Sequence, residues 1–137
     1  MTRRIGTRMT RSIALLLLLL AAGCNEPAQG VVILTPEALL SDPPREVLIL
    51  DVRTREEFAQ SHVPGARNIP HDELAGRLDE LGADHERNVV VYCESGRRAG
   101  MAESTLLAAG FTAVHHLEGD MKAWRAAERP TEGGGAL

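Results

Sequence analysis

The sequence predicts an α/β fold, a five-stranded parallel sheet with helices on both of its faces. Two runs, 47–52 and 89–92, are continuously apolar, which is typical of strands buried on both faces. Segments with helix signals separate the expected strands, and a helix is the usual connection between parallel strands. The 137 residues, 44% hydrophobic and 25% charged, suffice for one globular domain and a short processed segment.

Five segments carry strand signals. The first is rich in β-branched residues, the second and fourth are the apolar runs, and the third follows a turn at Pro64 and Gly65. The fifth contains His115 and His116, whose side chains should face opposite sides of the strand, so we do not expect them to bind one metal ion together. In chain order, the expected strands are 31–34, 47–52, 66–69, 89–92 and 111–116.

Five further segments carry helix signals. Thr35 and Pro36 provide a cap and a first helical residue, and the sequence at 54–57 fits a capping box. Leucines at positions i, i+4 and i+7 form an apolar stripe in the third segment, and Gly110 stops the fourth. We expect Trp124 to pack the last helix onto the domain. In chain order, the expected helices are 36–40, 54–60, 71–82, 99–109 and 121–127.

The first 23 residues have the pattern of an export signal. Four arginines precede an uncharged apolar run at 13–22, which is much shorter than the roughly 20 residues of a spanning helix. Small residues directly before Cys24 resemble the lipobox of bacterial lipoproteins. This resemblance implies that Cys24 is lipidated and becomes the first residue of the mature protein. The alternative is an ordinary signal that is cleaved near Ala22 or Gly23.

The lipobox resemblance also implies a location. A lipoprotein is anchored in the bacterial cell envelope and faces the periplasm, and Asn25 weakly favours the outer membrane. A net charge of −4 and 3% aromatic residues argue against nucleic-acid binding. The expected organisation is a signal at 1–23, a lipidated cysteine and tether at 24–30, a domain at 31–128 and a flexible tail at 129–137.

Cys93 is the candidate nucleophile. It directly follows the apolar strand 89–92, and sites of parallel sheets lie at the carboxyl ends of strands. Two cysteines exclude a multi-disulfide scaffold, and lipidation of Cys24 would leave Cys93 as the lone thiol. A tight loop follows, whose N–H groups, together with the next helix N-terminus, favour the thiolate. The candidate substrate-binding loop is Glu94, Ser95, Gly96, Arg97 and Arg98.

The chain carries four stretches of motif in register, namely 50–53 (LDVR) with 56–58 (EEF), 62–70 (HVPGARNIP), 91–98 (VYCESGRR), and 117–119 (LEG) with Ala123 and Trp124. Together they resemble the single-domain rhodaneses, the sulfurtransferase family. The resemblance implies a rhodanese-like five-stranded parallel sheet and covalent catalysis without a metal ion or an organic cofactor. It implies that Cys93 takes sulfur from thiosulfate or a related donor as a persulfide and passes it to cyanide or a thiol. A periplasmic sulfur-accepting or reducing protein is a further candidate partner.

The loop length separates this resemblance from that to related phosphatases. Those enzymes have five residues between cysteine and arginine, which would put the arginine at Ala99, whereas Arg98 follows Cys93 after four. A six-residue loop suits a sulfur atom rather than a phosphate. Two positions depart from the family pattern. Glu94 stands where a basic or small residue is common and should repel anionic thiosulfate, and Asp120 stands where a second glycine is common.

Three residues near the site are expected to be structural. Asp51 and Arg53 should form a buried ion pair, and His62 should make a structural hydrogen bond. Arg98 is expected either to contact the substrate or to brace the loop, and Arg97 to face solvent. Three functions stay open. They are a thiosulfate-type sulfurtransferase, a persulfide carrier or interaction module with little free thiosulfate turnover, and a non-catalytic or phosphatase-type domain.

Overall fold

The computed structural model describes residues 30–134, so the export signal and Cys24 lie outside the described residues. Five parallel strands form one sheet in the order β1-β5-β4-β2-β3, as the sequence predicts for the fold class. The elements in chain order are β1 (Val32–Leu34), α1 (Pro36–Ser41), β2 (Leu48–Asp51), α2 (Arg55–Gln60), β3 (Arg67–Asn68), the 3-10 turns η1 (Leu74–Gly76) and η2 (Leu78–Leu81), β4 (Val89–Tyr92), α3 (Arg97–Ala108), β5 (Val114–Leu117) and α4 (Asp120–Ala126).

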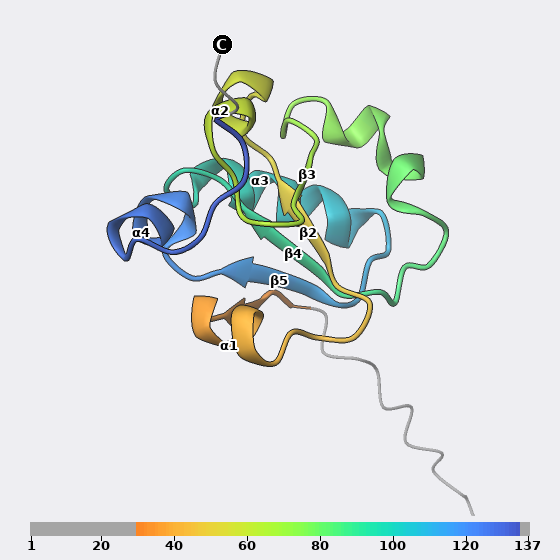
Figure 1. Cartoon of the computed structure of the whole chain (residues 1–137). Coiled ribbons are helices and arrows are strands. Elements are labelled where there is room, and N and C mark those ends of the chain that lie inside the picture. The colour runs from red at the N-terminus through yellow and green to blue at the C-terminus, as the bar shows by residue number, and fades with distance from the viewer. Residues whose placement is uncertain (1–29, 135–137) are drawn as a thin grey trace, which may run out of the picture.

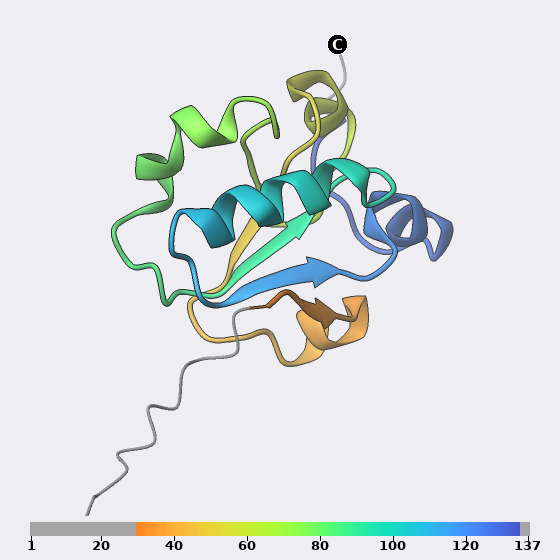
Figure 2. The ribbon, with the colours of Figure 1, turned by 180° about the vertical axis from the view of Figure 1, so that it is seen from behind.

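Helices cover both faces of the sheet. Figure 1 shows α1 and α4 beside β5, and Figure 2, from behind, shows α3 lying across β4. Each face has its own hydrophobic cluster. The α3 side buries Leu50, Val91 and Leu106, whereas the other side buries Tyr92 and Trp124. Among residues 30–134, the buried apolar side chains form these two clusters, one on each face of the sheet.

The predicted caps of the first two helices are confirmed. The Thr35 side chain accepts a hydrogen bond from the backbone N–H of Ala38 at the start of α1. Thr54 and Glu57 form a reciprocal capping box at the start of α2. Such caps satisfy N–H groups that have no partner within the helix, which is why a local pattern of four residues suffices to start it.

The prediction of one helix at 71–82 is wrong. The segment forms the two separate turns η1 and η2, with Arg77 between them at a φ of −130°. Gly76 is a poor residue for a helix interior, which helps to explain why the two turns do not merge. The apolar stripe is nevertheless on the correct face, because Leu74 and Leu81 are fully buried against α3 and the sheet.

The described part of the expected tail, 129–134, makes hydrogen bonds to the domain. The indole N–H of Trp124 donates to the carbonyl of Pro130 at 2.7 Å, and the backbones of His62 and Glu132 form an antiparallel bridge. These bonds fasten the end of the domain beside α2. Residues 135–137 lie outside the described residues.

Smaller differences concern element ends. The last strand begins at Val114 rather than at residue 111, and α3 begins at Arg97 rather than at residue 99. The earlier helix start matters, because it brings the first turn of α3 directly onto the loop after β4. None of the helices within residues 30–134 has the length and apolar composition to cross a membrane.

Candidate active site

Cys93 lies at the carboxyl end of β4, the central strand of the sheet (Figure 1). All four residues of β4 are buried, so the strand is held from both faces and the cysteine that follows it is fixed in place. The Cys93 residue is itself only 1% exposed. The cysteine therefore sits at the floor of the loop that connects β4 to α3.

The loop folds back over the sulfur. Gly96 donates its backbone N–H to Sγ of Cys93 at 3.0 Å. Gly96 is also the N-cap of α3 and has a φ of +99°, a conformation that side-chain-bearing residues rarely adopt. The glycine thus allows the chain to turn from β4 into α3 while one N–H points at the sulfur, which favours a negatively charged sulfur.

Arg98 braces this loop from within. Its guanidinium donates two hydrogen bonds to the Glu57 carboxylate, at 2.7 and 2.9 Å. The hydrogen bonds from Arg98 lower the pKa of Glu57 to about 2 despite partial burial. Of the two expected roles for Arg98, this geometry supports bracing, and Arg97 is exposed as expected.

Glu94 is engaged by arginines. Its carboxylate pairs with Arg125 of α4 and lies 3.8 Å from the Arg53 guanidinium. About a third of the Glu94 side chain is exposed. The two guanidinium groups offset part of the negative charge that the sequence places next to Cys93, so the expected repulsion of anionic donors is weaker than the sequence alone suggests. Ser95, the next loop residue, is exposed.

The predicted buried ion pair is present. Arg53 and Asp51 are 2% and 0% exposed, and their closest atoms lie 2.6 Å apart. The guanidinium also donates to the carbonyl of Ser61 at 2.8 Å and lies over the Tyr92 ring. The pair thereby joins the end of β2 to the segment after α2. Burial is the main cause that raises the pKa of Tyr92, whose hydroxyl accepts the N–H of Val63.

His62 has the structural position that was predicted. Its Nδ1 lies 2.7 Å from the carbonyl of Phe58, and its ring stacks on the Phe58 ring at a centroid distance of 3.6 Å. Its Nε2 lies 3.7 Å from the Glu132 carboxylate. The imidazole therefore joins α2 to the end of the domain.

Three residues at the site are not among the predicted site residues, although Asp120 was expected near its mouth in a fold of this kind. The Asp120 carboxylate accepts the backbone N–H of Cys93 at 2.8 Å. His116 lies between Asp120 and Glu103, at 3.1 and 2.5 Å. The unusual acid at position 120 was the one available signal. His115 lies apart, bonded to Asn88, which confirms that the adjacent histidines face opposite ways.

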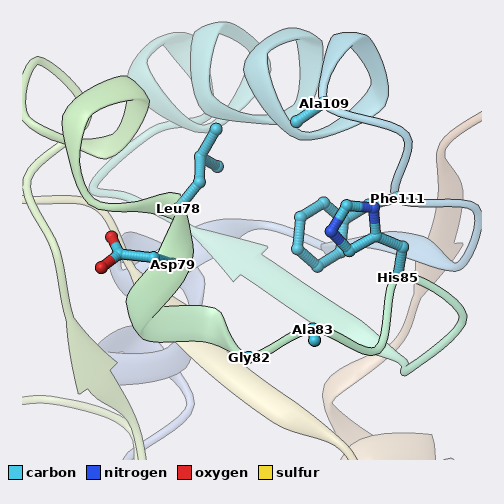
Figure 3. A pocket seen from close by; sticks show the side chains of 7 residues that line it. All are labelled: Leu78, Asp79, Gly82, Ala83, His85, Ala109 and Phe111. Carbon is cyan, nitrogen blue, oxygen red and sulfur yellow. The ribbon is translucent and has the colours of Figure 1, made fainter.

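A cavity of about 370 Å³ lies where β4 begins, at the opposite end of that strand from Cys93. Figure 3 shows the side chains that line it. It is bounded by η2, by the end of α3, and by the stacked rings of His85 and Phe111. None of the predicted site residues lines it. Among residues 30–134, no group of three or more His, Cys, Asp or Glu side chains is placed to hold a metal ion.

Comparison with known proteins agrees with this geometry. The family model of the rhodanese-like domain matches residues 36–127. The thiosulfate sulfurtransferase PspE of Escherichia coli is 40% identical over 70 residues, which are 51% of this chain and 67% of that protein. Homologues of this kind support sulfur transfer as the general chemistry.

Other relatives are longer than the matched region. The putative sulfur carrier protein YrkF of Bacillus subtilis is 37% identical over 61% of this chain, and the chain spans only 44% of that relative. It spans 62% of YqhL from the same organism. A solved rhodanese with anions from E. coli has a TM-score of 0.55 at 34% identity, covering 64% of this chain and 99% of that one.

Proposed function

Because this chain belongs to the family of rhodanese-like domains, we propose that it is a sulfurtransferase in which Cys93 carries the transferred sulfur as a persulfide. The main support for this proposal is the geometry of the loop that follows β4. Six residues run from Cys93 to Arg98, and Gly96 among them donates its N–H to the sulfur at 3.0 Å. The relative PspE is named as a thiosulfate sulfurtransferase, which supports the same chemistry here.

The proposed first step is an attack on the donor. The Cys93 thiolate forms a bond to the outer sulfur of thiosulfate, the sulfur–sulfur bond of thiosulfate breaks, and sulfite leaves with the electron pair. Cys93 then carries a persulfide anion. The Gly96 N–H stabilises the negative Sγ of Cys93 before the step, and the positive dipole end at the start of α3 favours the negative outer sulfur after it.

The second step regenerates the thiolate. An acceptor with a free electron pair, such as cyanide or a cellular thiolate, bonds to the outer sulfur of the persulfide. The sulfur–sulfur bond to Cys93 breaks and its electron pair returns to Sγ. The product is thiocyanate when cyanide accepts, or a new persulfide when a thiol does. Neither step needs an added oxidant or reductant.

A persulfide carrier is the second candidate, and Glu94 is the observation that favours it. The carboxylate directly follows the nucleophile and keeps a third of its surface exposed, so it opposes small anionic donors even with its arginine partners. The similarity to YrkF, a putative sulfur carrier protein, supports this alternative. A carrier would accept sulfur from a protein or a polysulfide and turn over thiosulfate slowly.

Intact mass spectrometry tests both candidates. Residues 25–137, which include both hydrophobic clusters of the described domain, are incubated with thiosulfate or polysulfide and then with cyanide, beside Cys93→Ser as the matched control. One added sulfur that cyanide removes again, absent from Cys93→Ser, is the expected result. Loading by polysulfide alone would favour the carrier, and no loading by either donor would refute sulfur transfer.

We also propose that Cys24 anchors the protein in the cell envelope, with the domain facing the periplasm and an outer-membrane destination favoured by Asn25. The support is the arginine cluster, the apolar run and the small residues before Cys24. Labelling of cells with an alkyne fatty acid should mark the full chain, and Cys24→Ser should abolish the label. Equal labelling of both proteins would contradict the anchor.

A further inference from the structure

Three charged side chains gather beneath the Cys93 loop, and the proposed chemistry does not use them. Glu103 comes from α3, His116 from β5, and Asp120 is the first residue of α4. Glu103 and Asp120 are 8% and 3% exposed, and the His116 side chain is 17% exposed. Burial of such groups is costly unless they are paired, so their arrangement calls for a physical account.

The imidazole of His116 joins the two carboxylates. Its Nδ1 lies 2.5 Å from an oxygen of Glu103, and its Nε2 lies 3.1 Å from Oδ2 of Asp120. A neutral imidazole has only one N–H, and its other nitrogen would then face a carboxylate with a lone pair. The imidazolium donates to both. This geometry therefore favours a positively charged His116 between two negative side chains.

Charge and burial act on His116 in opposite directions. Burial by itself lowers the pKa of His116, but the hydrogen bond to Glu103 and the charges of Asp120 and Glu103 outweigh burial, so the pKa lies above its ordinary value. The direction agrees with the hydrogen-bond geometry.

The Asp120 carboxylate supports the loop at two points. Oδ1 accepts the backbone N–H of Cys93 at 2.8 Å. Oδ2 lies under Gly96, so close that a Cβ at that position would be 3.2 Å from it. Gly96 is the residue whose N–H reaches the sulfur. A shift of Asp120 would therefore move both the nucleophile and its hydrogen-bond donor.

The backbone of Asp120 is held in a costly conformation. Its φ is +54°, in the left-handed region that aspartate adopts less readily than glycine. The N–H groups that follow, of Met121 and Lys122, donate to the carbonyls of Cys93 and Glu94 at 3.0 and 3.1 Å. Asp120 thus stands where the first turn of α4 meets the loop, and its side chain points back to Cys93.

The charge of Asp120 opposes a thiolate at Cys93, and the nearby arginines are paired with other carboxylates. Arg98 is paired with Glu57, although Cys93 also contributes to its raised pKa, and Arg125 is paired with Glu94. His116 is the cation in direct contact with Asp120. The charged groups around the loop, taken from every neighbouring element, are Arg53, Glu57, Glu94, Arg97, Arg98, Glu103, His116, Asp120, Lys122 and Arg125.

We propose that Asp120, His116 and Glu103 are positioning residues for the Cys93 loop. Asp120 holds Cys93 and Gly96 in register, and the imidazolium of His116, held by Glu103, offsets the Asp120 charge so that Cys93 ionises. This inference rests on the proposed function, in which the Cys93 thiolate is the nucleophile.

The ultraviolet absorbance of the thiolate, followed against pH, tests this without any sulfur donor. Residues 25–137 lack Cys24, so the signal reports Cys93 alone, and Cys93→Ser supplies the blank. His116→Gln removes the cation and should raise the midpoint of the titration by on the order of one pH unit. Asp120→Asn keeps an oxygen acceptor and tolerates the positive φ, but removes the nearest negative charge. It should lower the midpoint.

Opposite shifts are the result that separates charge balance from a general loosening of the loop. A loosened loop would move both midpoints in the same direction, and that outcome would overturn the inference, as would an unchanged midpoint in His116→Gln. His116→Lys returns a cation between the carboxylates and should bring the midpoint back toward the wild-type value. If His116→Gln fails to fold, the Asp120→Asn and His116→Lys titrations still decide the question.

The persulfide assay adds a second readout. At a pH below the thiolate midpoint measured for the wild-type protein, His116→Gln should load sulfur from thiosulfate about tenfold more slowly, because a smaller fraction of Cys93 is ionised. Failure of sulfur loading in the wild-type protein would remove the proposed function alone. The thiolate midpoints would still test the arrangement of Asp120, His116 and Glu103, so the two failures are distinguishable.

Discussion

Removal of the Arg53 guanidinium is expected to destabilise the domain severely. Arg53→Met keeps much of the side-chain volume but leaves the Asp51 carboxylate without its cation. Asp51 is fully buried, and Arg53 donates to both of its oxygens through Nε and Nη2, at distances of 2.6 to 3.1 Å. Of the four hydrogen bonds that residue 53 donates to Asp51, the variant would keep only the one from its backbone N–H.

The magnitude follows from the burial of both partners. Loss of one partner from a buried ion pair costs about 3–5 kcal/mol, because the other charge stays buried and uncompensated. Domains of this size are stable by about 5–15 kcal/mol in total. One kcal/mol corresponds to roughly 4–8 °C in Tm, so a fall of at least about 12 °C is expected.

Urea and thermal unfolding of residues 25–137 measure this loss. Arg97→Met is the matched control, since Arg97 is exposed and its change should stay within about 0.5 kcal/mol. The double variant Asp51→Asn with Arg53→Met removes the orphaned charge and should recover part of the stability. A cost below about 1 kcal/mol for Arg53→Met, similar to that of the control, would refute the reasoning.

Three further predictions concern the loop and its supports. Glu57→Gln should cost at most about 1 kcal/mol at neutral pH, since the Glu57–Arg98 pair is partly exposed. The pKa of Glu57 is lowered to about 2 in the folded domain, so the ion pair stabilises the domain at pH values above the ordinary pKa of a glutamate, and this stabilisation is lost as the pH falls toward 2. A difference in urea midpoint between the wild-type protein and Glu57→Gln that is the same at pH 6 and at pH 2 would contradict this. Glu94→Gln should raise kcat/KM for thiosulfate about two- to tenfold by removing a negative charge beside the nucleophile, and a fall would count against repulsion of that donor. Gly119→Ala should unfold or strongly destabilise the domain, because its Cβ would lie 2.4 Å from that of Ala123 at a φ of +75°, and a wild-type Tm would disprove this clash.

Local signals predicted the elements that a few neighbouring residues can form alone. The capping box at Thr54 and the apolar run of β4 appear where the sequence places them. The segment 71–82 was mispredicted because its leucine spacing suits an α-helix, while Gly76 and the available packing favour two short turns. The hydrogen bonds of residues 129–134 could not be predicted from the sequence, because His62 is distant along the chain and Trp124 reaches Pro130 only in the folded domain.

The sequence by itself determined the fold class and the position of Cys93 at the end of a buried strand, followed by a six-residue loop. Those properties depend on the order of residues along one short segment. The tertiary structure decided what lies beneath that loop. Glu103, His116 and Asp120 come from a helix, a strand and a second helix, and only the packing of α3, β5 and α4 brings their charges within hydrogen-bond distance. Hydrogen bonds have short range, so no pattern along the chain specifies which distant side chains will form them.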